Sequence, residues 1–167
     1  ILIVCLGRAT KQAEALQAQP KEYLTTLALG ATTPSFDMEH PVDRTFPYEH
    51  ITRQMLEEAL RTMEGEQMQL PPVYSAKSID GKRAYEYARQ GTEVEMRRAP
   101  VTVYGMRLES FEPPRATLRI RCSKGTYIRS IARDLGEKLG SGAYLTALCR
   151  TRSGDFTLED AYTLPQV

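Results

Sequence analysis

The stretch Cys122–Arg129 holds the side chains of this sequence that are best suited to chemistry. Its cations and its aromatic residue are Lys124, Tyr127 and Arg129. The surrounding pattern predicts that a strand ends here and a helix begins, with Thr126 as the helix N-cap. A helix N-terminus presents unpaired N–H groups and the positive end of the helix dipole, so this junction would suit an anionic ligand. The alternative is an ordinary strand–helix corner with a solvated arginine.

Two periodic segments flank this stretch and would hold it in place. Before it, apolar residues alternate with polar ones, which is the period of a half-buried strand. These apolar residues are Ala116, Leu118, Ile120 and Cys122. After it, apolar residues recur with helical spacing and would form one buried face. They are Ile128, Ile131, Ala132, Leu135 and Leu139.

The rest of the chain predicts strands and helices without a regular βαβ alternation. Strands are predicted at Ile1–Leu6, Glu22–Leu29, Val73–Lys77 and Pro100–Phe111, and two glycines lead into the segment Tyr144–Arg150. Helices are predicted at Ala9–Gln17, from an N-cap at Thr52 to Gly65, at Lys82–Arg89 and from Leu158 onward. This order favours an α+β fold with a mixed, largely antiparallel central sheet flanked by helices. We expect one domain over residues 1–167.

The segment Ala31–His50 has no apolar periodicity and contains several prolines. It is longer than most connections inside a compact domain, and loops of that length are usually functional or mobile. We therefore expect it either to carry function or to order when a ligand binds.

Composition argues for a protein of a reducing compartment, without a membrane span or a metal. No apolar run approaches membrane length. The three cysteines are odd in number and have no C-x-x-C spacing, which is typical of buried thiols in the cytoplasm. Only His40 and His50 could add imidazole ligands, so we expect no metal site.

Charge is segregated along the chain although the net charge is only +1. Residues 1–76 contain six Lys and Arg against ten Asp and Glu, whereas residues 115–152 contain nine against two. Such segregation is typical of a protein with one polyanion-facing side. The alternative is a solvated basic face.

Four segments of the sequence resemble the TruB type of tRNA pseudouridine synthases, and together they extend over most of the chain. They are Leu6-Gly-Arg-Ala-Thr-Lys11, Lys21-Glu-Tyr23, Pro71-Pro-Val-Tyr-Ser-Ala-Lys77 with Tyr85-Glu-Tyr-Ala-Arg89, and Cys122–Arg129 continuing to Asp134-Leu-Gly136. The resemblance implies a catalytic domain built on a bent antiparallel sheet, with the active site in a cleft across it. It also implies isomerisation of a T-loop uridine (U55) of tRNA to pseudouridine, without cofactor or metal. The partner would be the T-arm of tRNA, and the enzyme a cytoplasmic monomer.

The resemblance assigns roles to individual residues of this sequence. Tyr23 matches the active-site tyrosine that stacks on the target base and takes part in proton removal from its C5. Arg129 matches the arginine that pairs with the catalytic aspartate, and Leu148 matches an apolar residue that lines the base pocket. The predicted RNA-binding residues are Lys77, Lys82, Tyr85, Arg89, Lys124, Tyr127 and Arg150.

The nucleophile of the family is the Asp of a G-H-x-G-x-L-D-P-x-A-x-G segment, and no stretch of this sequence matches it. We expect that segment to precede Ile1 in a longer protein, so that the present chain alone would be inactive. Two other functions stay open. One is a non-catalytic module that binds or folds tRNA on the same basic surface. The other is a small-molecule enzyme with a phosphate at the helix N-terminus near Thr126, although no P-loop or dinucleotide fingerprint supports it.

Overall fold

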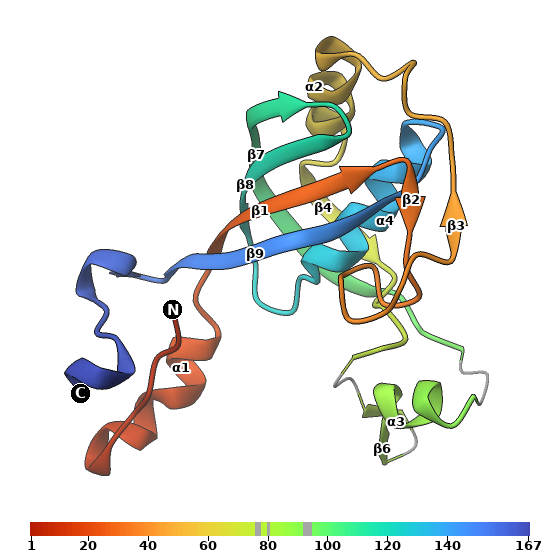
Figure 1. Ribbon diagram of the computed structural model, residues 1–167. Helices are drawn as coiled ribbons and strands as arrows, with labels where there is room; N and C mark the ends of the chain where they lie inside the picture. The colour runs from red at the N-terminus through yellow and green to blue at the C-terminus, as the bar shows by residue number, and fades with distance from the viewer. Residues whose placement is uncertain (76–77, 80, 92–94) are drawn as a thin grey trace.

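The structure is a computed structural model that describes residues 1–75, 78–79, 81–91 and 95–167. Its centre is a six-stranded sheet in the order β10-β9-β1-β8-β7-β4 (Figure 1). The strands are β1 (Lys21–Leu29), β4 (Gly65–Gln69), β7 (Ala99–Glu112), β8 (Arg115–Cys122), β9 (Ala143–Ser153) and β10 (Phe156–Thr157). Every neighbouring pair in this sheet is antiparallel. The predicted α+β class with a largely antiparallel sheet is thus confirmed.

Two helices complete the hydrophobic core. Helix α4 (Ile128–Lys138) packs against β9, and helix α2 (Arg53–Thr62) packs against β7 and α4. Sheet and helices contribute to one cluster, and its largest fully buried apolar side chains are Leu27, Leu56, Leu118, Ile120, Ile131, Leu135 and Val103. The alternating and helical apolar patterns on either side of the turn at residues 123–127 therefore meet in one core, which anchors that turn from both directions.

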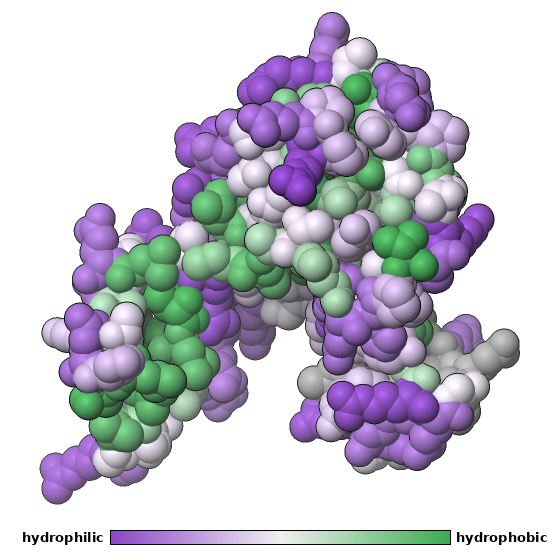
Figure 2. All heavy atoms as spheres, in the orientation of Figure 1, coloured by the Kyte–Doolittle hydropathy of each residue, from purple (hydrophilic) through white to green (hydrophobic). Residues whose placement is uncertain are grey.

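Two parts of the chain project from this core. One is a hairpin of β5 (Ser78–Ile79) and β6 (Lys82–Arg83), followed by α3 (Ala84–Arg89). The other contains α1 (Ala13–Gln17) and both chain termini, beyond the ends of β1 and β9 (Figure 1). Figure 2 shows that these projections leave a hollow between them below the sheet. In the described part of the chain, no helix has the length and hydrophobicity needed to cross a membrane.

The predicted strand at Ile1–Leu6 is wrong. Residues 1–6 form no strand, and the side chains of Leu2 and Val4 are 78% and 69% exposed. The segment is apolar enough for a buried strand, but within the described residues no neighbouring strand pairs with it. Its first residue is held by a hydrogen bond, since the amino group of Ile1 donates to the carbonyl of Arg150 at 2.6 Å.

Other predicted boundaries shift for identifiable reasons. The strand predicted at Val73–Lys77 is wrong for residues 73–75, which bend after the two prolines; residues 76 and 77 lie outside the described part. The helix predicted at Ala9–Gln17 is divided into a 3₁₀ helix, Gly7–Gln12, and α1. The helix predicted from Leu158 is a 3₁₀ turn, Leu158–Asp160.

The two predicted helix N-caps have opposite outcomes. Thr52 caps α2, and its hydroxyl accepts a hydrogen bond from the Met55 amide at 3.1 Å. Thr126 is not the cap of α4, because its hydroxyl donates to the Ser123 carbonyl at 2.8 Å. The N-cap of α4 is Tyr127. The Tyr127 amide donates to the side chain of Gln69 at 2.9 Å, so a residue from β4 holds the start of this helix.

Candidate active site

Tyr23 and Leu148 lie on the same side of the sheet because of the strand register. In the β1–β9 pair, Tyr23 is opposite Arg150 and Thr25 is opposite Leu148. Residues directly opposite each other in an antiparallel pair, and residues two apart on one strand, place their side chains on one face. Tyr23 is half-buried against the core, whereas Leu148 is 51% exposed. An exposed leucine beside a half-buried tyrosine is available to contact a planar ligand.

The environment of Tyr23 determines its protonation state. Burial, and then the neighbouring Cys122 thiol, raise the pKa of the Tyr23 phenol, and the charge of Arg150 and its hydrogen bond offset only part of this rise. A pKa above the usual value of about 10 keeps the hydroxyl protonated at neutral pH. In this structure the Tyr23 phenol can therefore donate a hydrogen bond, but it is not poised as a phenolate base.

Arg129 stands in the first turn of α4 and makes an ion pair with Asp37. The guanidinium Nε lies 3.9 Å from the Asp37 Oδ2, and an η nitrogen donates to the Ser35 carbonyl at 3.2 Å. The two side chains are 21% and 30% exposed. The family resemblance implies a carboxylate partner for Arg129, but no motif of that resemblance includes Asp37. The partner comes from the long loop Ala31–His50, which was expected to be functional or mobile.

The loop around Asp37 is held by its own polar groups. Thr33 donates to the Asp37 carbonyl at 2.6 Å and accepts from the Asp37 amide at 3.1 Å. The Asp37 Oδ1 accepts from the Ser35 hydroxyl and from the Glu39 amide. Hydroxyls four and two residues before an aspartate are typical of side-chain-closed turns. This spacing is the signal in the sequence that could have identified Asp37.

The Asp37 loop is also joined to the strand that carries Leu148. The carbonyl of Phe36 accepts a hydrogen bond from the amide of Leu145 on β9 at 2.9 Å. Phe36 has a φ of +58°, a conformation that non-glycine residues rarely adopt outside functional or over-constrained sites. Strand β9 therefore both carries Leu148 and holds the loop that contains Asp37.

The basic residues predicted to bind RNA fall into separate groups. On the projecting hairpin and α3, Lys82 lies over the ring of Tyr87 at 4.7 Å, and Arg89 lies over the ring of Tyr85 at 5.0 Å. Cations stacked on aromatic rings form mixed surfaces of the kind that bind single-stranded or looped nucleic acid. Lys77, also predicted to bind RNA, lies outside the described residues.

Arg150 and Tyr127 are engaged in contacts that the sequence does not reveal. The Arg150 Nε donates to the carbonyl of Ile1 at 2.9 Å. Burial, and then the charge of Arg150, lower the pKa of Lys21, which indicates that positive charge is concentrated at this end of β1. The backbone of Tyr127 is paired in both directions with the Gln69 side chain. The surface around Lys21 and Arg150 is electropositive, as an anion-binding surface requires.

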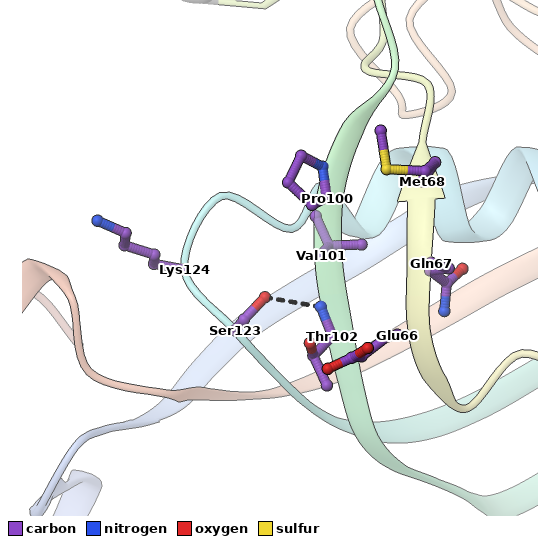
Figure 3. A pocket seen from close by; sticks show the side chains of 8 residues that line it. All are labelled: Glu66, Gln67, Met68, Pro100, Val101, Thr102, Ser123 and Lys124. Carbon is purple, nitrogen blue, oxygen red and sulfur yellow. Dashed lines mark hydrogen bonds between the residues drawn. The ribbon is translucent and has the colours of Figure 1, made fainter.

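Lys124 borders a second concavity, a groove of 590 Å³ at the edge of the sheet (Figure 3). The groove is lined by Glu66, Gln67, Met68, Pro100, Val101, Thr102, Ser123 and Lys124. Ser123 accepts from the Thr102 amide at 2.9 Å, whereas Lys124 extends away from β4 and β7. Its ammonium group is thus exposed. Among the residues that the structure describes, no three His, Cys, Asp or Glu side chains gather as a metal site.

Comparisons with known proteins agree with the resemblance noted from the sequence. Residues 1–128 match the model of the TruB family pseudouridylate synthase N-terminal domain, and residues 129–167 match the tRNA pseudouridylate synthase B C-terminal domain. The two matched ranges share one sheet, since β9, in the second range, pairs with β1, in the first.

Individual relatives are similar over nearly the whole chain. The tRNA pseudouridine synthase B of Phocaeicola vulgatus is 51% identical over 164 residues, which cover 98% of this chain and 70% of the relative. That of Bacteroides fragilis is 52% identical over 159 residues, with 95% and 68% covered. Among solved structures, a chain of a Cbf5-Nop10-Gar1 complex superposes with a TM-score of 0.66 at 26% identity. This match covers 92% of the present chain but only 36% of the solved one.

Proposed function

Since the chain belongs to the TruB family of tRNA pseudouridine synthases, we propose that it forms the base-holding and arginine-bearing part of an active site that isomerises a T-loop uridine of tRNA. The substrate would be the T-arm, and the compartment the cytoplasm. The observation that supports the proposal most is the shared anchorage of Tyr23, Leu148 and Arg129. Tyr23 and Leu148 share one face of the β1–β9 pair, and β9 also holds the Asp37 loop against which Arg129 is paired.

The proposed reaction requires the uridine to leave the stacked RNA. A flipped base would be held between the ring of Tyr23 and the exposed side chain of Leu148. In the isomerisation the N1–C1′ bond breaks, the C5–C1′ bond forms, the proton on C5 leaves and N1 takes up a proton, so that no atom is gained or lost. Because the Tyr23 phenol is kept protonated, its contribution would be stacking and hydrogen bonding, with proton acceptance only after its own proton has been passed on.

Arg129 would hold the nucleophilic carboxylate ionised and correctly oriented. Desolvation raises the pKa of a carboxyl group in a cleft, and an adjacent guanidinium opposes that rise. Its planar fork can engage two carboxylates at once. We assign Asp37 to orienting Arg129, because its Oδ1 is already occupied by Ser35 and by the Glu39 amide. The nucleophile would then be a further aspartate, supplied by the motif that this sequence does not match.

Arg129→Lys in the full-length enzyme tests this assignment. The substitution keeps the charge but removes the fork, so the single-turnover rate should fall by at least ~10-fold, equivalent to about 1.4 kcal/mol. The affinity for tRNA should change much less, because phosphate contacts elsewhere dominate it. Arg53→Lys on the exposed face of α2 is the matched control, since that arginine makes only a surface pair with Glu57.

The same experiment separates catalysis from RNA binding. A loss confined to tRNA affinity would favour the non-catalytic module that the basic surface also permits. Unchanged rate and affinity would remove Arg129 from the active site. Formation of pseudouridine by wild-type enzyme in the same assay is the reference for both outcomes.

A further inference from the structure

A chain of side-chain contacts extends from Arg129 through the Asp37 loop to His40. Arg129 faces the Asp37 Oδ2, and the Asp37 Oδ1 accepts from the Ser35 hydroxyl. The Ser35 Oγ lies 3.0 Å from the His40 Nδ1. Ser35 is completely buried, with 0% of its surface exposed. A buried hydroxyl needs hydrogen-bond partners, and here the two partners are Asp37 and His40.

The direction of these hydrogen bonds follows from the chemistry of a hydroxyl. Ser35 has one proton to donate, and that proton is directed to the Asp37 carboxylate. Its oxygen must therefore accept from His40, so the Nδ1 of His40 carries a hydrogen. His40 thereby fixes the rotation of the Ser35 hydroxyl. Ser35 in turn fixes the rotation of the Asp37 carboxylate.

Ser35 also holds Arg129 directly. Its backbone carbonyl accepts from the Arg129 guanidinium at 3.2 Å, while its side chain binds Asp37. A change at the Ser35 side chain would therefore alter both the direction of Arg129 and that of its carboxylate partner. Partners of this kind orient groups that bind a substrate without touching it, as in the outer shell of a metal site.

The imidazole of His40 is itself held by a ring contact. The ring of Tyr74 lies 4.6 Å from it, centre to centre, with an interplanar angle of 49°. Tilted aromatic pairs at such distances are favourable. Tyr74 belongs to the segment between β4 and the projecting hairpin. His40 thus lies between the Asp37 loop and the chain that leads to the predicted RNA-binding residues.

We propose that His40 is a positioning residue, which acts through Ser35 and Asp37 to direct the guanidinium of Arg129. The inference rests on the proposed function, because it assigns Arg129 to the reaction. Beyond that function, the reaction depends on a hydrogen bond donated by His40, which reaches Arg129 only through Ser35 and Asp37. The role needs a donor at the position of the Nδ1 and does not need an imidazole charge.

Two substitutions at His40 separate the hydrogen bond from the ring contact. His40→Asn keeps an amide donor near the position of Nδ1 and loses the ring against Tyr74. His40→Phe keeps a ring and loses the donor. In the full-length enzyme we expect the single-turnover rate of the Phe variant to fall about 10-fold, equivalent to about 1.4 kcal/mol, and that of the Asn variant to stay within about 3-fold of wild type.

Binding of the tRNA is the readout that a purely structural role would move. Its dissociation constant should remain within about 2-fold of wild type in both variants, since the phosphate contacts are elsewhere. Equal rates for the Phe and Asn variants would overturn the proposal, as would a loss that appears only in tRNA affinity. A thermal unfolding midpoint that drops equally in both variants with equal loss of rate would also overturn it.

A double-mutant cycle with Ser35→Ala tests the connection. If His40 acts only through Ser35, the double variant Ser35→Ala with His40→Phe should be no slower than Ser35→Ala alone. If the fold losses in rate of the two single variants multiply in the double variant, His40 acts by another route and the proposal is overturned. If the wild-type enzyme forms no pseudouridine at all, the proposed function fails. If the wild type is active and His40→Phe matches it, only the positioning role fails.

Discussion

The loop Thr33–His40 and the terminal segment Ile1–Leu6 are opposites in composition and in burial. The loop is largely polar, yet Thr33 and Ser35 are 2% and 0% exposed. The terminal segment is apolar, yet three of its side chains, Leu2, Val4 and Leu6, are mostly exposed. Figure 2 shows this apolar surface on the projection that contains the termini.

The difference is one of available partners. Each buried polar group of the loop described above has a hydrogen bond within the loop or to Arg129. Burial of a polar group costs little when its hydrogen bonds are made. The apolar segment would gain free energy from burial, but within the described residues only one side of it is covered. Ile3 and Cys5 line a pocket with Ala13 and Leu16 of α1, whereas the alternate side chains stay exposed. Burial in this protein follows from partners rather than from hydropathy alone.

The largest expected effect on the free energy of unfolding is a difference between two glycine-to-alanine variants. Gly30→Ala lies at the start of the loop, and Gly7→Ala lies just after the terminal segment. Both residues have positive φ, +88° and +55°, so alanine should strain both by about 1–2 kcal/mol. A Cβ on Gly30 would also lie 2.6 Å from the Tyr48 ring, whereas none at Gly7 meets a neighbour within 4 Å. We therefore expect a further ~1–3 kcal/mol at Gly30 only.

Urea unfolding of the two glycine variants measures this difference directly. Equal losses would show that the loop moves aside without cost. In that case the loop would be no better packed than the terminal segment, and the comparison would fail.

An intermediate effect is expected from Thr33→Val, which makes the loop more hydrophobic at nearly constant shape. The amide and carbonyl of Asp37 would each lose a hydrogen bond with the Thr33 hydroxyl. Leaving buried polar groups unsatisfied typically costs ~1–3 kcal/mol. The free energy of unfolding should fall by that amount, measured by denaturant titration. Thr33→Ser, which retains the hydroxyl, is the control; an unchanged stability for Thr33→Val would contradict the account.

The smallest effect is expected from Val4→Thr, which makes the apolar segment more polar. Val4 is 69% exposed, and substitutions at such positions usually change stability by less than about 0.5 kcal/mol. The same denaturant titration on the 167-residue chain applies. A cost above ~1 kcal/mol would show that another surface covers this segment in solution.

Local periodicity was sufficient to predict most of the regular elements. The alternation in β8, the apolar stripe of α4 and the Thr52 cap of α2 depend on residues two to four apart. These spacings place side chains on one face of a strand or helix whichever distant segment packs against that face. The roles predicted for Tyr23, Leu148 and Arg129 come instead from resemblance to a family, since spacing alone also permits an ordinary strand–helix corner.

Contacts between distant residues could not be predicted in this way. The pairing of Arg129 with Asp37, the exposure of Leu2 and the hydrogen bond from the Tyr127 amide to Gln69 each join or separate segments far apart in sequence. Hydropathy and helix signals carry no information on which distant segment will pack against a given element. The sequence by itself determined most of the strands and helices and the chemical types of the residues proposed for the site. The tertiary structure alone decided which carboxylate faces Arg129, because that choice depends on how a polar loop closes over the end of a helix.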